Sequence, residues 1–267
     1  MRGETARPSR FIGAFLSTTS LALFAAGCTS LRSADAPMYT QSDPSQCVAH
    51  ADTLIVMLPG VYSYPDEFAR EGFLRAIDRA RIAADVVRVD AHLGYYEKNT
   101  FVERLGRDVI EPATAHGYRA IWIFGISLGG FGGLIYAQEH PEDVTGVVAL
   151  APYLGAPATS DAVARAGGLM RWTAPANPAG DERARRETAL WTSLKRQASL
   201  PAAATPQLWL GYGLAARFAQ SNGLLGAVLP PERVFTTEGG HDWAPWLRLW
   251  TSILPGLPLP RCPSTAP

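Results

Sequence analysis

The sequence predicts an α/β fold in which helices cover both faces of a mainly parallel sheet. Short β-rich runs alternate with longer segments of helical periodicity from residue 51 onward, and this alternation is typical of parallel sheets. The β-rich runs are mostly apolar, as strands buried on both faces are. With 267 residues, 47% of them hydrophobic, the chain is long enough for one domain with a substantial core.

Six segments have the composition of buried strands, and the clearest is TLIVML at residues 53–58. The others are residues 85–92, 120–124, 146–152, 207–213 and 233–237. Helical periodicity is clearest in residues 65–80, 100–110 and 243–254. Pro65 stands at the start of the first helical segment, where proline is favoured because its missing N–H is not needed there.

The alternation is interrupted between the fourth and fifth predicted strands. An insertion over about residues 155–203 predicts a small cap above the sheet. Met170, Trp172 and Trp191 lie within it and either line an apolar pocket or pack the insertion onto the main domain. The charged run DERARRE, which begins at residue 181, is interpreted as a solvated helix face.

The first residues are expected to be an export signal rather than part of the fold. Arg2, Arg7 and Arg10 precede the apolar run FIGAFLSTTSLALFAAG, which ends in small residues. This run is too short and too rich in Ser and Thr to form a comfortable membrane span. We therefore expect a signal peptide at residues 1–27, a flexible tether at 28–46 and the folded domain at 47–267.

The end of this segment, AAGC, resembles the bacterial lipobox, with Ala25 where leucine is more usual. The resemblance implies that Cys28 becomes the lipidated first residue, so that acyl chains anchor the protein to a membrane. An ordinary cleaved signal is the alternative. Thr29 resembles the residue that directs lipoproteins to the outer membrane. The localisation implied is the bacterial envelope, as an exported outer-membrane lipoprotein facing the periplasm.

Cys47 and Cys262 bracket the expected domain almost end to end. Outside the cytoplasm a disulfide between them is permitted, and the two ends of a domain often lie close together. The export signal favours this bridge over two unrelated thiols.

The charge and the residue spacing exclude several other classes of function. The chain has 24 basic and 24 acidic residues and a formal net charge of +0, so nothing favours a nucleic acid as partner. No metal-ligand spacing occurs, and FGISLGGFGG lacks the lysine of a phosphate-binding P-loop. We therefore expect neither a metal nor a cofactor.

The strongest motif is G-x-S-x-G, which residues 125–129 match as Gly-Ile-Ser-Leu-Gly. A strand is predicted directly before it and a helix directly after it, which is the context that this motif requires. Glycines are needed there because the turn is sharp and larger side chains would collide with adjacent strands. Ser127 is therefore a candidate nucleophile, and a loop hydroxyl is the alternative.

With this motif the sequence resembles the α/β-hydrolase superfamily, in particular its esterase- and lipase-like members, over about residues 51–254. The chain order in that family is nucleophile, acid, histidine. The resemblance implies that His241, in EGGHDW after the last predicted strand, is the general base rather than a surface loop histidine. His140 ends the helix behind Ser127 and should lie far from it, and His92 is interpreted as a structural residue.

The resemblance also implies an oxyanion hole made by two backbone N–H groups. One belongs to Leu128, the residue after the nucleophile. The other belongs to the loop after the first predicted strand, where Pro59 replaces the histidine of the family's usual His-Gly. Val61 is the candidate there, with Tyr62 as its competitor.

The family's acid is the point at which this sequence departs from the pattern. The segment that resembles G-x-x-D-R-F reads GLAARF here, with Ala216 in place of the aspartate. Three readings remain open. Another carboxylate, from Glu238, Asp242 or Asp161, takes the role; a Ser-His dyad works slowly without it; or the fold has lost efficient catalysis.

The resemblance therefore implies a serine hydrolase that cleaves small-molecule carboxylic esters through an acyl-enzyme. Thioesterase, lipase or acyltransferase activity on other acyl substrates would use the same residues. The alternative from another class is a catalytically impaired lipoprotein with this fold that binds an apolar ligand or partner.

Overall fold

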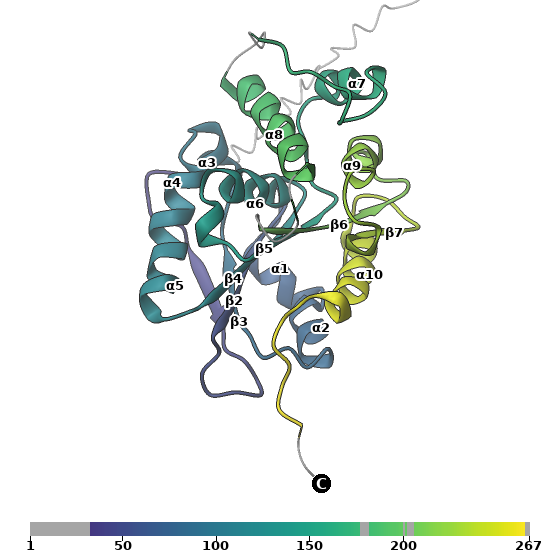
Figure 1. The fold of residues 1–267 in the computed structure, drawn as a ribbon. Coiled ribbons are helices and arrows are strands. Elements are labelled where there is room, and N and C mark those ends of the chain that lie inside the picture. The colour runs from purple at the N-terminus through teal and green to yellow at the C-terminus, as the bar shows by residue number, and fades with distance from the viewer. Residues whose placement is uncertain (1–32, 177–181, 200, 202–205, 265–267) are drawn as a thin grey trace, which may run out of the picture. The chain divides into compact units, whose positions relative to one another are not determined.

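A computed structural model of the protein describes residues 33–176, 182–199, 201 and 206–264, which belong to one compact unit. Their strands form one seven-stranded sheet in the order β1-β3-β2-β4-β5-β6-β7 (Figure 1). Strand β1 pairs antiparallel with β3, and all other pairings are parallel. The expected signal peptide, Cys28 and Thr29 lie outside the described residues.

Strands β2 to β7 confirm the six predicted β-rich segments, whereas β1 was not predicted. They are β1 (Thr40–Asp43), β2 (Thr53–Leu58), β3 (Asp85–Val89), β4 (Ala120–Ile126), β5 (Gly146–Leu150), β6 (Gln207–Gly213) and β7 (Val234–Thr237). Every residue of β2 and β5 is buried, because helices cover the sheet on both faces.

The helices are α1 (Pro65–Arg70), α2 (Phe73–Arg79), α3 (Leu93–Glu97), α4 (Phe101–Leu105), α5 (Glu111–His116), α6 (Leu128–Glu139), α7 (Pro157–Arg165), α8 (Glu182–Ala198), α9 (Ala219–Gly226) and α10 (Trp243–Ile253). A π-helical turn, Gly106–Ile110, joins α4 to α5. The segment expected to be one helix over 65–80 is divided because Gly72 has φ 94°, a left-handed conformation that ends a helix.

Each face of the sheet has its own hydrophobic core. Helices α1, α2 and α10 pack on one face, where the Trp250 Nε1–H donates to the Phe73 carbonyl at 3.2 Å. Helices α3 to α6 and α8 contribute to the core on the other face (Figure 1). This arrangement confirms the predicted α/β fold class. Among the described residues no helix combines the length and the apolar composition that a membrane span requires.

The N-terminal part of the domain corrects the expectation of a flexible tether over 28–46. Residues 40–43 pair with β3, and Arg88 binds the Asp43 carboxylate through Nε at 2.7 Å and Nη2 at 3.1 Å. Ala34 and Met38 are buried in the core. The folded domain therefore begins before residue 47, because a few apolar contacts and one ion pair hold a segment of polar composition.

The insertion expected over about 155–203 contains α7 and α8. Trp191 of α8 is fully buried and donates from Nε1 to the Leu154 carbonyl at 2.7 Å. Trp172 is buried in the same core, whereas Met170 is 47% exposed. The two tryptophans therefore pack the insertion onto the main domain.

A disulfide joins Cys47 to Cys262, with 5.6 Å between the two Cα atoms, and confirms the expected bridge. Replacing both residues by serine is expected to lower the free energy of unfolding by about 2–5 kcal/mol, because a bridge across so long a loop restricts the unfolded chain strongly. Urea denaturation under oxidising and reducing conditions measures this. Reductant should destabilise the wild type and leave the double variant unchanged; equal stability of the two oxidised proteins would contradict the expectation.

Candidate active site

Ser127 occupies the turn between β4 and α6, as the motif predicts. Its backbone has φ 55° and ψ −112°, a conformation that costs free energy in a residue with a side chain and that clusters at functional sites. Two backbone hydrogen bonds hold it: its N–H donates to the Leu150 carbonyl at 2.9 Å, and its carbonyl accepts from Tyr153 N–H at 3.0 Å. The neighbouring strand β5 therefore fixes the turn.

The glycines around Ser127 are required by close backbone contacts. A Cβ on Gly125 would overlap the backbone of Gly129, and a Cβ on Gly129 would overlap the Leu58 carbonyl. The turn is therefore pressed against the end of β2, which brings the loop after β2 next to the serine.

The structure brings Ser127 and His241 together from positions 114 residues apart, with 2.9 Å between Oγ and Nε2. His241 lies in the loop between β7 and α10. The rings of Phe218 and Trp246 each meet the imidazole edge to face, with centroids 5.0 Å away. These contacts hold the imidazole in an apolar slot, and the serine is itself 3% exposed.

The other ring nitrogen of His241, Nδ1, is buried and has no hydrogen-bond partner among the described residues. Ala216 is 7% exposed in the loop after β6. That loop lies against the histidine loop, since Ala215 N–H donates to the Gly239 carbonyl at 3.0 Å. Ala216, which the resemblance in sequence places at the family's acid position, thus provides only a methyl group in the loop that lies against the histidine loop.

None of the three candidate carboxylates hydrogen-bonds to His241. Asp242 begins α10 and accepts from Ala244 N–H at 3.3 Å. Asp161 accepts from the Gln220 side chain at 3.3 Å, and Glu238 is exposed. A carboxylate adjacent to the histidine in sequence points to the helix start instead, because the unpaired N–H groups there attract it.

Burial lowers the pKa of His241 to about 4, with a further contribution from the positive charge of Arg217 that Asp242 partly offsets. The desolvated slot disfavours the imidazolium form. The imidazole is therefore neutral at neutral pH and able to accept a proton.

This pKa predicts the acid limb of the pH profile. Neutral imidazole is the reactive form, so kcat/KM should be constant near neutral pH and fall as the pH drops through about 4. Arg217→Gln removes a charge that lowers the pKa and should move the midpoint to higher pH. Ester hydrolysis followed from pH 3 to pH 8 (roughly the window in which such a base titrates) measures both. An unmoved midpoint in the variant would contradict the assignment.

The residues whose backbone N–H groups are the candidate oxyanion donors lie close to the serine. Leu128 is the first residue of α6, so its N–H has no partner within the helix. A Cβ on Gly60 would lie 3.7 Å from the Cβ of Ser127, which places the β2 loop beside the nucleophile. Val61, the next residue, is half-buried, whereas Tyr62 is 85% exposed. This favours Val61 over Tyr62 as the second donor.

A cavity of about 380 Å³ lies between α3, α4, α6 and α8. Ser127 does not line it, but Leu128, the next residue, does, and so does Tyr153, whose N–H donates to the Ser127 carbonyl. Helix α8 contributes Glu182, Arg183 and Arg186. Glu182, Arg183 and Arg185 are exposed, as the interpretation of a solvated helix face predicts. That interpretation is wrong for Glu187, which is 2% exposed and accepts from the Tyr153 hydroxyl at 2.5 Å. In the sequence, only the alternation of Arg and Glu at helical spacing indicated that α8 forms a wall of the cavity.

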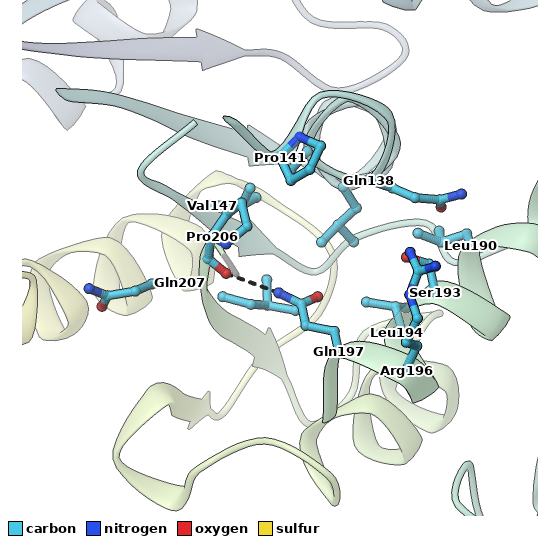
Figure 2. Close-up of a pocket in the computed structure, with 13 residues that line it drawn as sticks. Gln138, Pro141, Val147, Leu190, Ser193, Leu194, Arg196, Gln197, Pro206 and Gln207 are labelled. Atoms are coloured by element: carbon cyan, nitrogen blue, oxygen red, sulfur yellow. Dashed lines mark hydrogen bonds between the residues drawn. The ribbon is translucent and has the colours of Figure 1, made fainter. Parts of the chain in front are cut away.

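A second cavity of about 210 Å³ lies at the opposite end of α6, against the starts of β5 and β6 (Figure 2). Gln138 and Pro141 line it, and Gln197 Nε2–H donates to the Pro206 carbonyl at 2.9 Å. It is separated from Ser127 by the length of α6.

His140 and His92 lie where the sequence analysis expected them. His140 ends α6, away from Ser127, with Nδ1 4.0 Å from Asp143. His92 is buried at the start of α3 and accepts from Gly94 N–H at 3.2 Å. Within the described ranges no group of three or more His, Cys, Asp and Glu residues is positioned to hold a metal ion.

Comparisons with known proteins agree with this fold. A family model described as alpha/beta hydrolase fold matches residues 100–248. No curated protein matches the chain by sequence. Est1E from Butyrivibrio proteoclasticus has a TM-score of 0.58 at 14% identity, with 82% of this chain and 92% of that chain covered.

Two Staphylococcus aureus structures are also similar. S-formylglutathione hydrolase FrmB has a TM-score of 0.52 at 16% identity, with 80% of this chain and 81% of that one covered. FphF, a fluorophosphonate-binding serine hydrolase, has a TM-score of 0.52 at 15% identity, with coverages of 82% and 98%. At these identities the likeness concerns the fold.

Proposed function

The chain belongs to the α/β-hydrolase fold family, and from that premise we propose that it is a serine hydrolase that cleaves carboxylic esters through an acyl-enzyme. One observation carries the proposal: a hydroxyl on a strained turn lies 2.9 Å from a neutral, half-buried imidazole. That pairing is the requirement for nucleophilic activation of serine.

In the first step, Ser127 Oγ attacks the ester carbonyl while His241 Nε2 takes its proton. The oxyanion that forms would accept hydrogen bonds from the N–H groups of Leu128 and Val61, each worth about 3–4 kcal/mol in comparable sites. The imidazolium then protonates the departing alkoxide. Water, activated by the same imidazole, releases the acid from the serine.

The unpaired Nδ1 atom sets the efficiency of this mechanism. For Nε2 to accept the proton of Ser127, the neutral ring must carry its own proton on Nδ1, which is buried without an acceptor. Leaving a buried donor unpaired costs about 1–3 kcal/mol, and the imidazolium formed during attack has no anion beside Nδ1. We therefore assign a working Ser-His dyad of low turnover.

Labelling with a fluorophosphonate probe tests the proposal. The wild type should be labelled on Ser127, and Ser127→Ala should not. If the folded wild-type protein resists labelling but binds acyl ligands, the binding-protein function is correct instead. Hydrolysis of thioester and lipid substrates distinguishes thioesterase and lipase activity from simple ester cleavage.

Export and lipid anchoring form a second part of the proposal, supported by the basic start, the apolar run and AAGC of the sequence. Cells supplied with a clickable fatty acid should label the protein, and Cys28→Ala should prevent this. Label retained in the variant would place the lipid elsewhere; an unlabelled wild type would favour an ordinary cleaved signal.

A further inference from the structure

The cavity beside the nucleophile has a far wall that is charged. Near Ser127 it is lined by apolar and aromatic side chains, among which Phe131 meets Tyr153 with ring centroids 5.7 Å apart, and Tyr96 stacks on Phe101 at 4.2 Å. Helix α8 closes the other side with arginine and glutamate side chains. One side of the cavity is therefore apolar and aromatic, and the other side is charged.

Arg183 is held within this wall by two hydrogen bonds. Its Nε–H donates to Glu187 at 3.2 Å, its Nη2–H donates to the Tyr153 hydroxyl at 2.8 Å, and its guanidinium lies over the Tyr153 ring. Glu187 also accepts from Ala156 N–H at 2.8 Å. This network, in which Glu187 is buried and Arg183 is exposed, joins Tyr153 to α8.

Arg186 is different, because most of its donors are available. Its one hydrogen bond within the described chain is from Nε to Glu182, at 3.4 Å. Glu182 is held more closely by Arg185, at 3.1 Å and 2.8 Å. The side chain of Arg186 is only 31% exposed. Both terminal nitrogens thus remain without a partner among the described residues, on a side chain that lines the cavity.

The carboxylates on the described part of α8 are occupied. Arg183, Arg185 and Arg186 face two carboxylates, Glu182 and Glu187, and both carboxylates are already bonded to arginine. Glu97 lines the cavity from α3 and carries the opposing charge, but it is exposed and therefore screened by water and salt.

We infer that this cavity binds the acyl part of an ester whose far end carries a carboxylate, which Arg186 holds. A planar guanidinium with two free nitrogens matches a carboxylate in geometry and charge. The substrate class is the monoester of a dicarboxylic acid. Hydrolysis consumes one water and releases the alcohol and the free dicarboxylate. The inference rests on the proposed function, since it assigns the cavity to the acyl group that Ser127 attacks.

A matched pair of esters tests the inference by binding, without turnover. Monoethyl adipate and ethyl hexanoate have the same acyl length and differ in the terminal carboxylate. Calorimetric titration of Ser127→Ala protein should show at least about tenfold tighter binding of monoethyl adipate, as expected for charge-assisted hydrogen bonds. Arg186→Gln, added to this variant, should reduce that ratio about tenfold.

Arg185→Gln is the matched control, because Arg185 pairs with the same Glu182 and does not line the cavity. It should keep the ratio of the parent protein. Equal affinity for the two esters, or an equal loss of the ratio in both arginine variants, overturns the inference. Fluorophosphonate labelling of Ser127 is scored separately. A labelled protein that lacks the preference for monoethyl adipate refutes carboxylate recognition and leaves the hydrolase function standing. An unlabelled protein refutes the hydrolase function.

Discussion

Replacing Ala216 by aspartate is expected to raise kcat/KM by about 10²–10⁴-fold, the inverse of what losing the acid costs serine hydrolases. The aspartate would stand in the loop that packs against the histidine loop, next to an Nδ1 atom that has no partner. Its carboxylate would accept the Nδ1 proton, fix the productive tautomer and stabilise the imidazolium.

Ala215→Asp is the control for this gain. Ala215 is the preceding residue and is exposed, so a carboxylate there adds the same charge without filling the buried position. Steady-state hydrolysis of p-nitrophenyl acetate by the three proteins measures the effect. The acid limb of Ala216→Asp should also move to higher pH, because a nearby anion favours imidazolium. An unchanged or lower rate would mean that His241 already has another orienting group.

The loss of activity on removing the imidazole is expected to depend on whether position 216 holds alanine or aspartate. His241→Ala should lower kcat/KM about 10²-fold in the natural sequence, and about 10⁴-fold or more in the Ala216→Asp background. The reason is that the members of a triad act as a unit, so their losses are strongly non-additive. Where the acid is missing, the histidine contributes less to kcat/KM, and its removal therefore costs less.

The four proteins of this cycle are compared in one assay of burst and steady-state hydrolysis. The coupling between positions 216 and 241 is read from the ratio of the two losses. Equal losses in both backgrounds would show that the new aspartate acts without His241 and would remove the basis for assigning Ala216 to the vacant acid position. Circular dichroism of each variant confirms that the fold is retained.

The sequence predicted the parallel part of the sheet and the Ser127 turn because both depend on local patterns. Continuous apolar runs define strands buried on both faces, and the glycines around Ser127 reflect contacts with adjacent backbone. The pairing of Ser127 with His241 required only that both follow parallel strands of the same sheet, β4 and β7. For the strands and for this pair of residues, composition and topology determine where each residue lies.

Other features could not be predicted from the sequence, because single contacts determine them. Strand β1 has the polar sequence TQSD and lies at the sheet edge, where no alternation marks it. Its place depends on Arg88, which is buried and paired with Asp43. The position of Arg186 against the cavity was equally hidden, since a charged run on a helix has the same pattern whether it faces water or a cavity. The vacant acid position was visible in the sequence, but the lack of a substitute emerged only from the contacts of the three carboxylates.

The bridge between Cys47 and Cys262 has a mechanical consequence for a protein proposed to be tethered by one end. Tension applied along the chain between its two ends would cross from one cysteine to the other through the sulfur atoms. The sheet strands from β2 to β7, together with Ser127 and His241, lie between the two cysteines in sequence. A pull could therefore peel away β1 without reaching the catalytic pair.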